Sequence, residues 1–127
     1  MRILLVDDST TMRNIQRKIL SGLGYTEISE AGDGVQALAA FAARRPDLML
    51  VDWNMPNMDG LTLVRKIREQ DKTVLMMMVT TETEKERVID AIKAGANNYL
   101  VKPFTVAVFC EKIQQTFAKR RPVAASA

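Results

Sequence analysis

Carboxylate side chains follow two of the apolar runs in this 127-residue sequence. Asp7 and Asp8 come directly after the first run, and Asp52 comes directly after the third. A hydroxyl group at Thr80 and an ammonium group at Lys102 follow two later runs in the same way. If these runs are parallel strands of one sheet, their carboxyl ends meet at one edge and the five side chains converge there.

A cluster of three carboxylates needs a counter-charge. Two carboxylates about 5 Å apart repel by about 3 kcal/mol at an effective dielectric constant of about 20, so the cluster binds a cation or takes up a proton. An all-oxygen ligand set suits Mg²⁺, which takes one or two carboxylates together with water and phosphate. Solvated turn residues would explain Asp7 alone, but three acids, a hydroxyl and a lysine at four strand ends favour a built site.

Five short apolar runs alternate with five segments of helical periodicity. We expect strands at 3–6, 26–31, 48–51, 74–79 and 99–101, and helices at 12–23, 35–43, 61–67, 82–94 and 106–117. Such βα units with continuous apolar strands predict a parallel sheet covered on both faces. An eight-unit barrel needs about 200 residues or more, so the chain is too short for one. The prediction is an α/β, flavodoxin-like, open doubly wound sheet of five strands in the order 2-1-3-4-5.

The second expected helix, at 35–43, has a turn and a capping residue before it and an apolar stripe along it. Residues 32–34 predict a turn, and the Asp33 carboxylate is suited to cap the helix that follows. Within that helix we expect four apolar residues to face the core: Val35, Leu38, Phe41 and Ala42.

The composition excludes several chemistries and partners. Histidine is absent and only one cysteine is present, so a His-based triad, an imidazole metal site and an internal disulfide are all excluded. The net charge of +3 comes from three basic residues at 119–121, while 1–118 carry 15 basic and 15 acidic residues, which does not predict a nucleic-acid partner. The longest apolar run has seven residues, far fewer than the roughly 20 that a bilayer span needs, and acids arrive early in the chain, so we expect a cytoplasmic protein with no membrane partner.

Five motifs occur in order along the chain. They are Val-Asp-Asp-Ser at 6–9, Asp-Trp-Asn-Met-Pro at 52–56, Met-Asp-Gly at 58–60, Thr80, and Tyr-Leu-Val-Lys-Pro-Phe at 99–104. In this set the chain resembles the receiver domains of two-component response regulators, over about residues 2–118, and looks most like the stand-alone chemotaxis regulators. The resemblance implies a receiver domain at 1–118, and from the run of basic residues we expect 119–127 to form a basic, disordered tail.

The resemblance also implies roles for the residues at the sheet edge. Asp52 would accept a phosphoryl group from a histidine kinase. Mg²⁺ would be held by Asp8, Asp52 and the backbone carbonyl of Asn54, with Asp7 acting mainly through metal-bound water. Lys102 would hold a phosphoryl oxygen. Such a protein is not an enzyme in the usual sense, since it only phosphorylates itself from small donors and dephosphorylates itself.

A switch and a docking face are implied in the same way. The Thr80 hydroxyl would bind the new phosphoryl group, and Tyr99 would turn inward to fill the space that Thr80 leaves. The remodelled face would comprise helix 83–94, the last strand and helix 106–118, and its partner would be a flagellar-motor switch component. A phosphatase is a further possible partner, and we expect a monomer. The Lys102–Pro103 peptide bond is expected to be cis.

Two alternatives stay open at this point. A phosphorelay intermediate, which passes its phosphoryl group to a histidine phosphotransfer protein, would need the same residues. A haloacid-dehalogenase-like phosphatase also uses an aspartate nucleophile with Mg²⁺, but it needs a second acid two residues later. Asn54 stands at that position after Asp52, and Ser9 stands there after Asp7, so this reading is weaker.

Overall fold

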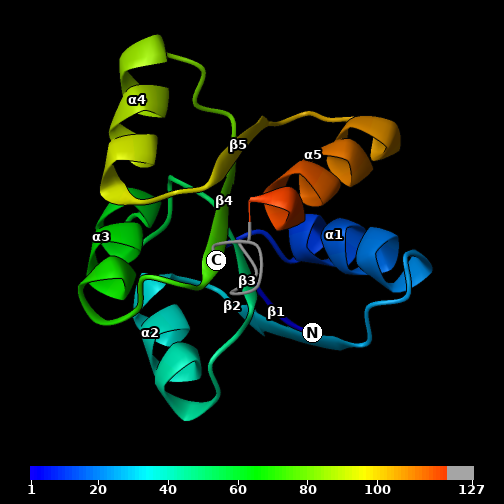
Figure 1. The fold of residues 1–127 in the computed structure, drawn as a ribbon, viewed down its shortest axis with the longest axis horizontal. Coiled ribbons are helices and arrows are strands. Elements are labelled where there is room, and N and C mark those ends of the chain that lie inside the picture. The colour runs from blue at the N-terminus through cyan, green and yellow to red at the C-terminus, as the bar shows by residue number, and fades with distance from the viewer. Residues whose placement is uncertain (120–127) are drawn as a thin grey trace, which may run out of the picture.

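The chain forms one parallel sheet of five strands between two layers of helices. The computed structural model describes residues 1–119, and Figure 1 shows α1 and α5 on one face of the sheet and α2, α3 and α4 on the other. The strand order is β2-β1-β3-β4-β5, which confirms the predicted fold. The strands are β1 (Arg2–Val6), β2 (Glu27–Ala31), β3 (Leu48–Val51), β4 (Leu75–Thr80) and β5 (Asn98–Val101). The helices are α1 (Thr10–Gly22), α2 (Gly34–Ala43), α3 (Gly60–Gln70), α4 (Lys85–Ala94) and α5 (Val106–Ala118).

The register of the central strands aligns their carboxyl ends. Val6, the last residue of β1, pairs with Val51, the last residue of β3. Val51 in turn pairs with Met78, two residues before the end of β4. The residues that follow these strands therefore emerge side by side at one edge of the sheet.

The core has two parts, one on each face of the sheet. Side chains alternate between the faces along each strand, so β3 and β4 are buried on both sides. In β4, Met76, Met77 and Met78 have no exposed surface, and Met77 lies in the cluster beneath α1 and α5 while its two neighbours lie in the other. Among the described residues, no helix is long and apolar enough to cross a bilayer.

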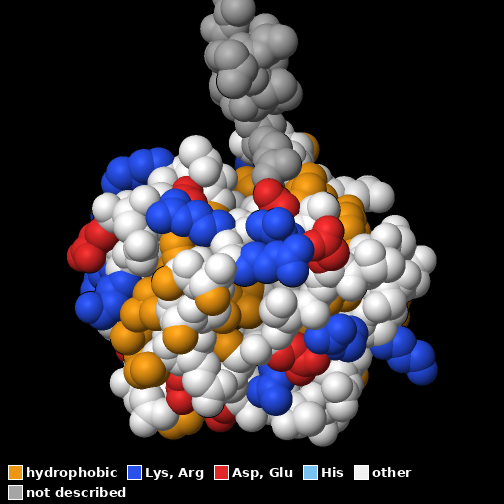
Figure 2. Space-filling model, turned by 90° about the horizontal axis from the view of Figure 1, so that it is seen from below, with side chains coloured by type: hydrophobic (Ala, Val, Ile, Leu, Met, Phe, Trp, Pro, Cys, Tyr) orange, Lys and Arg blue, Asp and Glu red, His pale blue; other side chains and the backbone are white. Residues whose placement is uncertain are grey.

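Charged groups of both signs are mixed on the surface. Figure 2 shows one face of the molecule, on which Lys and Arg side chains are interspersed with Asp and Glu. This agrees with the balanced charge of residues 1–118. The predicted basic tail, apart from Lys119, lies outside the described residues.

Two local expectations differ from the structure. The fourth helix begins at Lys85 and not at residue 82, because the backbone carbonyl of Glu82 accepts a hydrogen bond from the Tyr99 hydroxyl. In α2, Val35 is 53% exposed and Ala42 is exposed as well, whereas Ala37 and Phe41 are fully buried as part of the core. The prediction that Asp33 caps α2 is confirmed, since its carboxylate accepts a hydrogen bond from the Gln36 amide at 2.8 Å.

Candidate functional site

Three carboxylates meet at the carboxyl ends of β1 and β3. Asp7, Asp8 and Asp52 each offer one oxygen, and these oxygens all lie within 4.8 Å of one another. Asp7 and Asp52 are buried, while Asp8 is exposed to solvent. The Asp7 side chain is fixed by a 2.9 Å hydrogen bond from the Ser9 amide, and its own backbone amide donates to the Ala31 carbonyl. The convergence that the sequence predicts is therefore present.

A lysine supplies part of the counter-charge. The Lys102 ammonium nitrogen lies 2.9 Å from Oδ2 of Asp7 and 3.4 Å from Oδ2 of Asp52. Its backbone amide donates to the Thr80 carbonyl at 2.8 Å, which joins the ends of β4 and β5. The peptide bond between Lys102 and Pro103 is cis, as expected from the sequence. Three carboxylates and one ammonium leave a formal charge of minus two, which one divalent cation would balance.

The electrostatic setting favours charge neutralisation at Asp52. Burial raises the pKa of the Asp52 carboxyl above its ordinary value, because a charged group loses its hydration there. The Lys102 ammonium opposes that rise, and the Asp7 carboxylate adds to it. A bound cation would likewise stabilise the charged form of Asp52, and the carboxylate oxygens of the cluster lie close enough together to ligate one.

Thr80 and Tyr99 connect this site to the start of α4. Thr80 is fully buried, and its hydroxyl oxygen accepts a 3.3 Å hydrogen bond from the Glu82 amide. Tyr99 is only 8% exposed, and its hydroxyl donates to the Glu82 carbonyl at 2.7 Å. Burial raises the pKa of Tyr99 to about 12, so its hydroxyl stays protonated and remains a donor. Tyr99 is thus packed inward.

The loop from 53 to 59 starts at the site and returns to it. The Gly60 amide donates to the Trp53 carbonyl at 2.8 Å, which closes the loop at the base. A β-carbon at Gly60 would collide with the backbone carbonyl of Asp52, so α3 starts in direct contact with the strand end. Asn54 lies in this loop, exposed, two residues after Asp52.

Two arginines near the site were not predicted from the sequence. Arg13 of α1 donates to the backbone carbonyl of Asp7 and forms a 2.8 Å ion pair with Glu30. The Arg87 guanidinium of α4 lies over the Trp53 ring, 5.3 Å from its centroid. The Arg13–Glu30 and Arg87–Trp53 contacts join residues that are far apart in the chain, and neither arginine belongs to an apolar stripe, so no local pattern indicates them.

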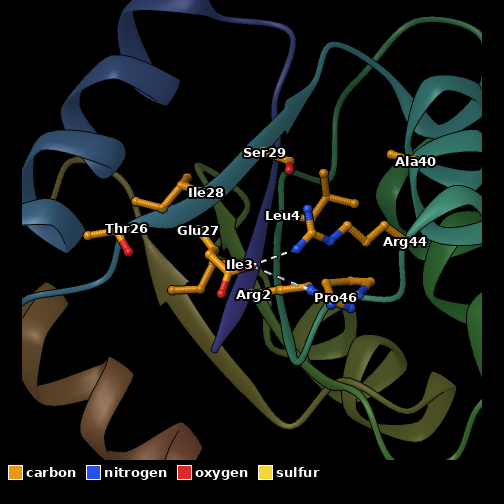
Figure 3. A pocket seen from close by; sticks show the side chains of 10 residues that line it. All are labelled: Arg2, Ile3, Leu4, Thr26, Glu27, Ile28, Ser29, Ala40, Arg44 and Pro46. Carbon is orange, nitrogen blue, oxygen red and sulfur yellow. Dashed lines mark hydrogen bonds and ion pairs between the residues drawn. The ribbon is translucent and has the colours of Figure 1, made fainter.

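A cavity of about 220 Å³ lies away from the carboxylates, at the amino ends of β1 and β2 (Figure 3). Two arginines line it, and both pair with the same carboxylate: Glu27 lies 3.6 Å from Arg2 and 2.9 Å from Arg44. The charges at this cavity are therefore paired, whereas the three carboxylates at the carboxyl edge have one ammonium beside them.

Comparisons with known proteins agree with this geometry. A family model described as the response regulator receiver domain matches residues 3–114. The chain is 44% identical over 121 residues to the chemotaxis protein CheY of Pseudomonas aeruginosa, covering 94% of this chain and 98% of the relative. It is 49% identical over 117 residues to the chemotaxis protein CheY1 of Helicobacter pylori, covering 90% and 94%.

A solved structure gives the same result in three dimensions. The CheX–CheY–BeF3–Mg²⁺ complex of Borrelia burgdorferi matches with a TM-score of 0.90 at 29% identity, covering 94% of this chain and 90% of that one. Because the family model, the relatives and the strand order all agree over most of the sequence, the chain belongs to the response regulator receiver domain family.

Proposed function

We propose that this chain is a single-domain response regulator that accepts a phosphoryl group on Asp52 from a histidine kinase and then binds a protein target in chemotaxis. The observation that carries the proposal is the convergence of Asp7, Asp8 and Asp52, with Lys102 beside two of them. The similarity to two chemotaxis proteins over nearly the whole chain supports chemotaxis as the setting.

The residues at the sheet edge fit Mg²⁺, since they offer a compact set of oxygen ligands. Asp8, Asp52 and the backbone carbonyl of Asn54 would hold the ion, and Asp7 would act through its bound water. When bound, Mg²⁺ neutralises charge on the phosphoryl oxygens, which otherwise repel the acidic cluster. The Borrelia structure, described as containing both BeF3 and Mg²⁺, supports this assignment.

Asp52 then acts as the nucleophile. One of its carboxylate oxygens forms a bond to phosphorus while the phosphorus–nitrogen bond of the kinase's phosphohistidine breaks and the imidazole keeps the electron pair. The Lys102 ammonium, 3.4 Å from Asp52, would turn to a phosphoryl oxygen as a compact cation. Loose phosphoryl transfer needs mainly positioning and charge, which these groups supply.

The switch would run through Thr80 and Tyr99. The Thr80 hydroxyl would donate to a phosphoryl oxygen that is absent before transfer, so this contact differs between the two states. Tyr99 already lies inward in the structure, held by the Glu82 carbonyl. Phosphorylation would therefore shift the population toward the arrangement in which Tyr99 lies inward.

The target would dock on α4, β5 and α5. Five of the nine large apolar side chains that are exposed in the described residues lie on these three elements: Ile89, Ile92, Val101, Val106 and Val108. An exposed apolar patch is typical of a protein-binding surface. A flagellar-motor switch component would be the target and a phosphatase a further partner. The receiver domain would span 1–118 of a cytoplasmic monomer.

A phosphorelay intermediate is the second candidate, because it would use the same site. Incubating the phosphorylated protein with a histidine phosphotransfer domain distinguishes the two functions. Rapid transfer of the phosphoryl group would favour the relay, and slow hydrolysis without transfer would favour the chemotaxis switch.

The direct test is labelling with acetyl phosphate in the presence of Mg²⁺. We expect the wild-type protein to gain one phosphoryl group, detected by intact-mass measurement or by Phos-tag electrophoresis. Asp52→Asn should gain none, because an amide oxygen is a far poorer nucleophile. Asp59→Asn is the matched control, since Asp59 is an exposed aspartate seven residues away, and it should be labelled normally. Full labelling of Asp52→Asn would overturn the assignment.

A further inference from the structure

A carboxylate outside the acidic cluster holds the loop that runs from 53 to 59. Asp33, at the amino end of α2, uses its two oxygens for two different tasks. Oδ1 accepts from the Gln36 amide at 2.8 Å and caps the helix. Oδ2 accepts from the side-chain amide of Asn57 at 2.7 Å. The cap alone needs one oxygen, so the second contact requires a separate explanation.

Asn57 is the point where the loop reverses. Its φ of 69° lies in the left-handed region, where residues other than glycine are uncommon and asparagine is among the better tolerated. The neighbouring Met58 amide donates to the Pro56 carbonyl at 2.7 Å, which tightens the same turn. The hydrogen bond to Asp33 therefore holds the loop at its most constrained residue.

A steric contact supports the same attachment. A β-carbon at Gly34, the first residue of α2, would lie 2.7 Å from the β-carbon of Met58 and 2.9 Å from its carbonyl oxygen. Both distances are shorter than a normal contact, so only glycine allows the loop to lie this close to α2. The loop thus docks on α2 through one hydrogen bond and one close packing contact.

The other end of the loop belongs to the acidic site. It leaves the sheet at Asp52, and the Gly60 amide closes it on the Trp53 carbonyl at 2.8 Å. Asn54, whose carbonyl is assigned to the metal under the proposed function, lies between this closure and the Asn57 turn. The position of that carbonyl is set by two anchors, one at Gly60 and one at Asp33.

We propose that Asp33 is a positioning residue for the metal site, which fixes the loop 53–59 through Asn57 so that the Asn54 carbonyl is preorganised for Mg²⁺. The proposal rests on the Mg²⁺ site of the proposed function. Groups outside the inner ligands of a metal often change metal affinity by about 10–100-fold when they are removed, because they orient the ligands. Asp33, at the start of α2, acts in this way on the loop that leads into α3.

Three variants separate positioning from helix capping. Asp33→Ser keeps a good cap for α2 but is too short to reach Asn57. Asp33→Asn keeps a cap oxygen, and its amide can donate to Asn57 when the Asn57 side chain turns over by 180°. Asn57→Gly keeps the left-handed backbone and removes the amide. Ile113→Val, in the core on the opposite face, serves as a control for general loss of stability.

The measurement is Mg²⁺ titration of the whole chain, followed by the fluorescence of Trp53, beside thermal unfolding and hydrogen exchange of the metal-free protein. We expect Asp33→Ser and Asn57→Gly each to raise the Mg²⁺ dissociation constant by about tenfold. The double variant should be no weaker than either single variant, because both remove one contact. In both single variants, the amides of 53–59 should exchange faster than in wild type.

The controls should behave differently. Asp33→Asn and Ile113→Val should stay within about twofold of the wild-type Mg²⁺ dissociation constant, whatever their melting temperatures. If wild type itself fails to bind Mg²⁺, the proposed metal site is wrong. If wild type binds and Asn57→Gly binds equally well, with unchanged exchange at 53–59, the positioning role of Asp33 is wrong. Asn57→Gly decides the question even if Asp33→Ser does not fold.

Discussion

Lys102 donates a 2.9 Å hydrogen bond to Asp7, a residue 95 positions away in the chain. The pair joins the end of β5 to the end of β1, and these strands are not neighbours in the sheet. The lysine is therefore engaged by an acid of the cluster. A phosphoryl group on Asp52 would compete with Asp7 for the same ammonium, which places Lys102 between the resting and the modified states.

The charge on Asp52 should destabilise the metal-free fold. Burial raises the pKa of Asp52 above its unfolded value, so the folded state binds the carboxyl proton more tightly. The free energy of unfolding therefore falls as pH rises from the unfolded pKa to the folded pKa. At pH 7 without Mg²⁺, Asp52→Asn should melt a few degrees higher than wild type. The gain should shrink as pH falls toward about 4, where the unfolded carboxyl is protonated as well.

Thermal unfolding of both proteins between pH 4 and pH 7 measures this effect. Asp90→Asn, which removes an exposed carboxylate of α4, controls for net charge and should show no comparable gain. Saturating Mg²⁺ should reduce or reverse the advantage of Asp52→Asn, because the ion binds the charged wild type. A wild-type protein more stable than Asp52→Asn at pH 7 without metal would contradict the prediction.

Asp8 should contribute to the metal and hardly to the fold. It is exposed and its removal leaves the buried pair of Asp7 and Lys102 intact. Asp8→Ala should weaken Mg²⁺ binding by at least about tenfold and abolish labelling by acetyl phosphate, with little change in melting temperature. Glu69→Ala, an exposed acid of α3, should leave both unchanged. Trp53 fluorescence, followed during the titration, reports the binding.

Thr80 should be needed for the response of α4 to phosphorylation but not for phosphorylation itself. Thr80→Ala should still be labelled at Asp52, because the nucleophile, the acids and Lys102 remain. The response of α4 should be lost, since the hydroxyl that meets the phosphoryl group is gone. Hydrogen exchange at 81–94, with and without beryllofluoride, measures this, and Thr80→Ser should retain the wild-type response. Equal responses in Thr80→Ala and wild type would rule out the relay.

Glycine at position 60 should be required for the fold near Asp52. A β-carbon there would collide with the backbone carbonyl of Asp52, which cannot rotate away as a side chain could. Gly60→Ala should lower the free energy of unfolding by about 1–3 kcal/mol. Gly22→Ala is the matched control, because nothing lies within 4 Å of its added carbon, and it should gain about 0.5–1 kcal/mol. Urea denaturation measures both.

The fold and the acidic cluster could be predicted because their signals are local. Continuous apolar runs identify the buried strands, and the residue after each run is automatically at the carboxyl edge. The prediction that Val35 faces the core was wrong, because the alanine-rich sequence of α2 gives little contrast between the two sides of the helix. The start of α4 was placed three residues early, because acids at 82 and 84 suit a helix start and an extended loop equally well.

The supporting contacts could not be predicted, for a different reason. Arg13 with Glu30 and Asn57 with Asp33 are polar contacts between segments that meet only after folding. Such contacts have no periodicity, and their residues are also common in solvated loops. The sequence indicates which side chains gather at the sheet edge, but only the structure shows what holds them in position.

The buried methionines of β3 and β4 would report how often the sheet opens. Met49, Met76, Met77 and Met78 are four of the eight methionines, and none has exposed surface. Peroxide converts accessible methionine to the sulfoxide, so it should reach the exposed Met1 in the folded state and these four only when the sheet separates. The rate at which their sulfoxides accumulate would therefore measure the frequency of global unfolding, and each oxidised sulfur would make refolding harder.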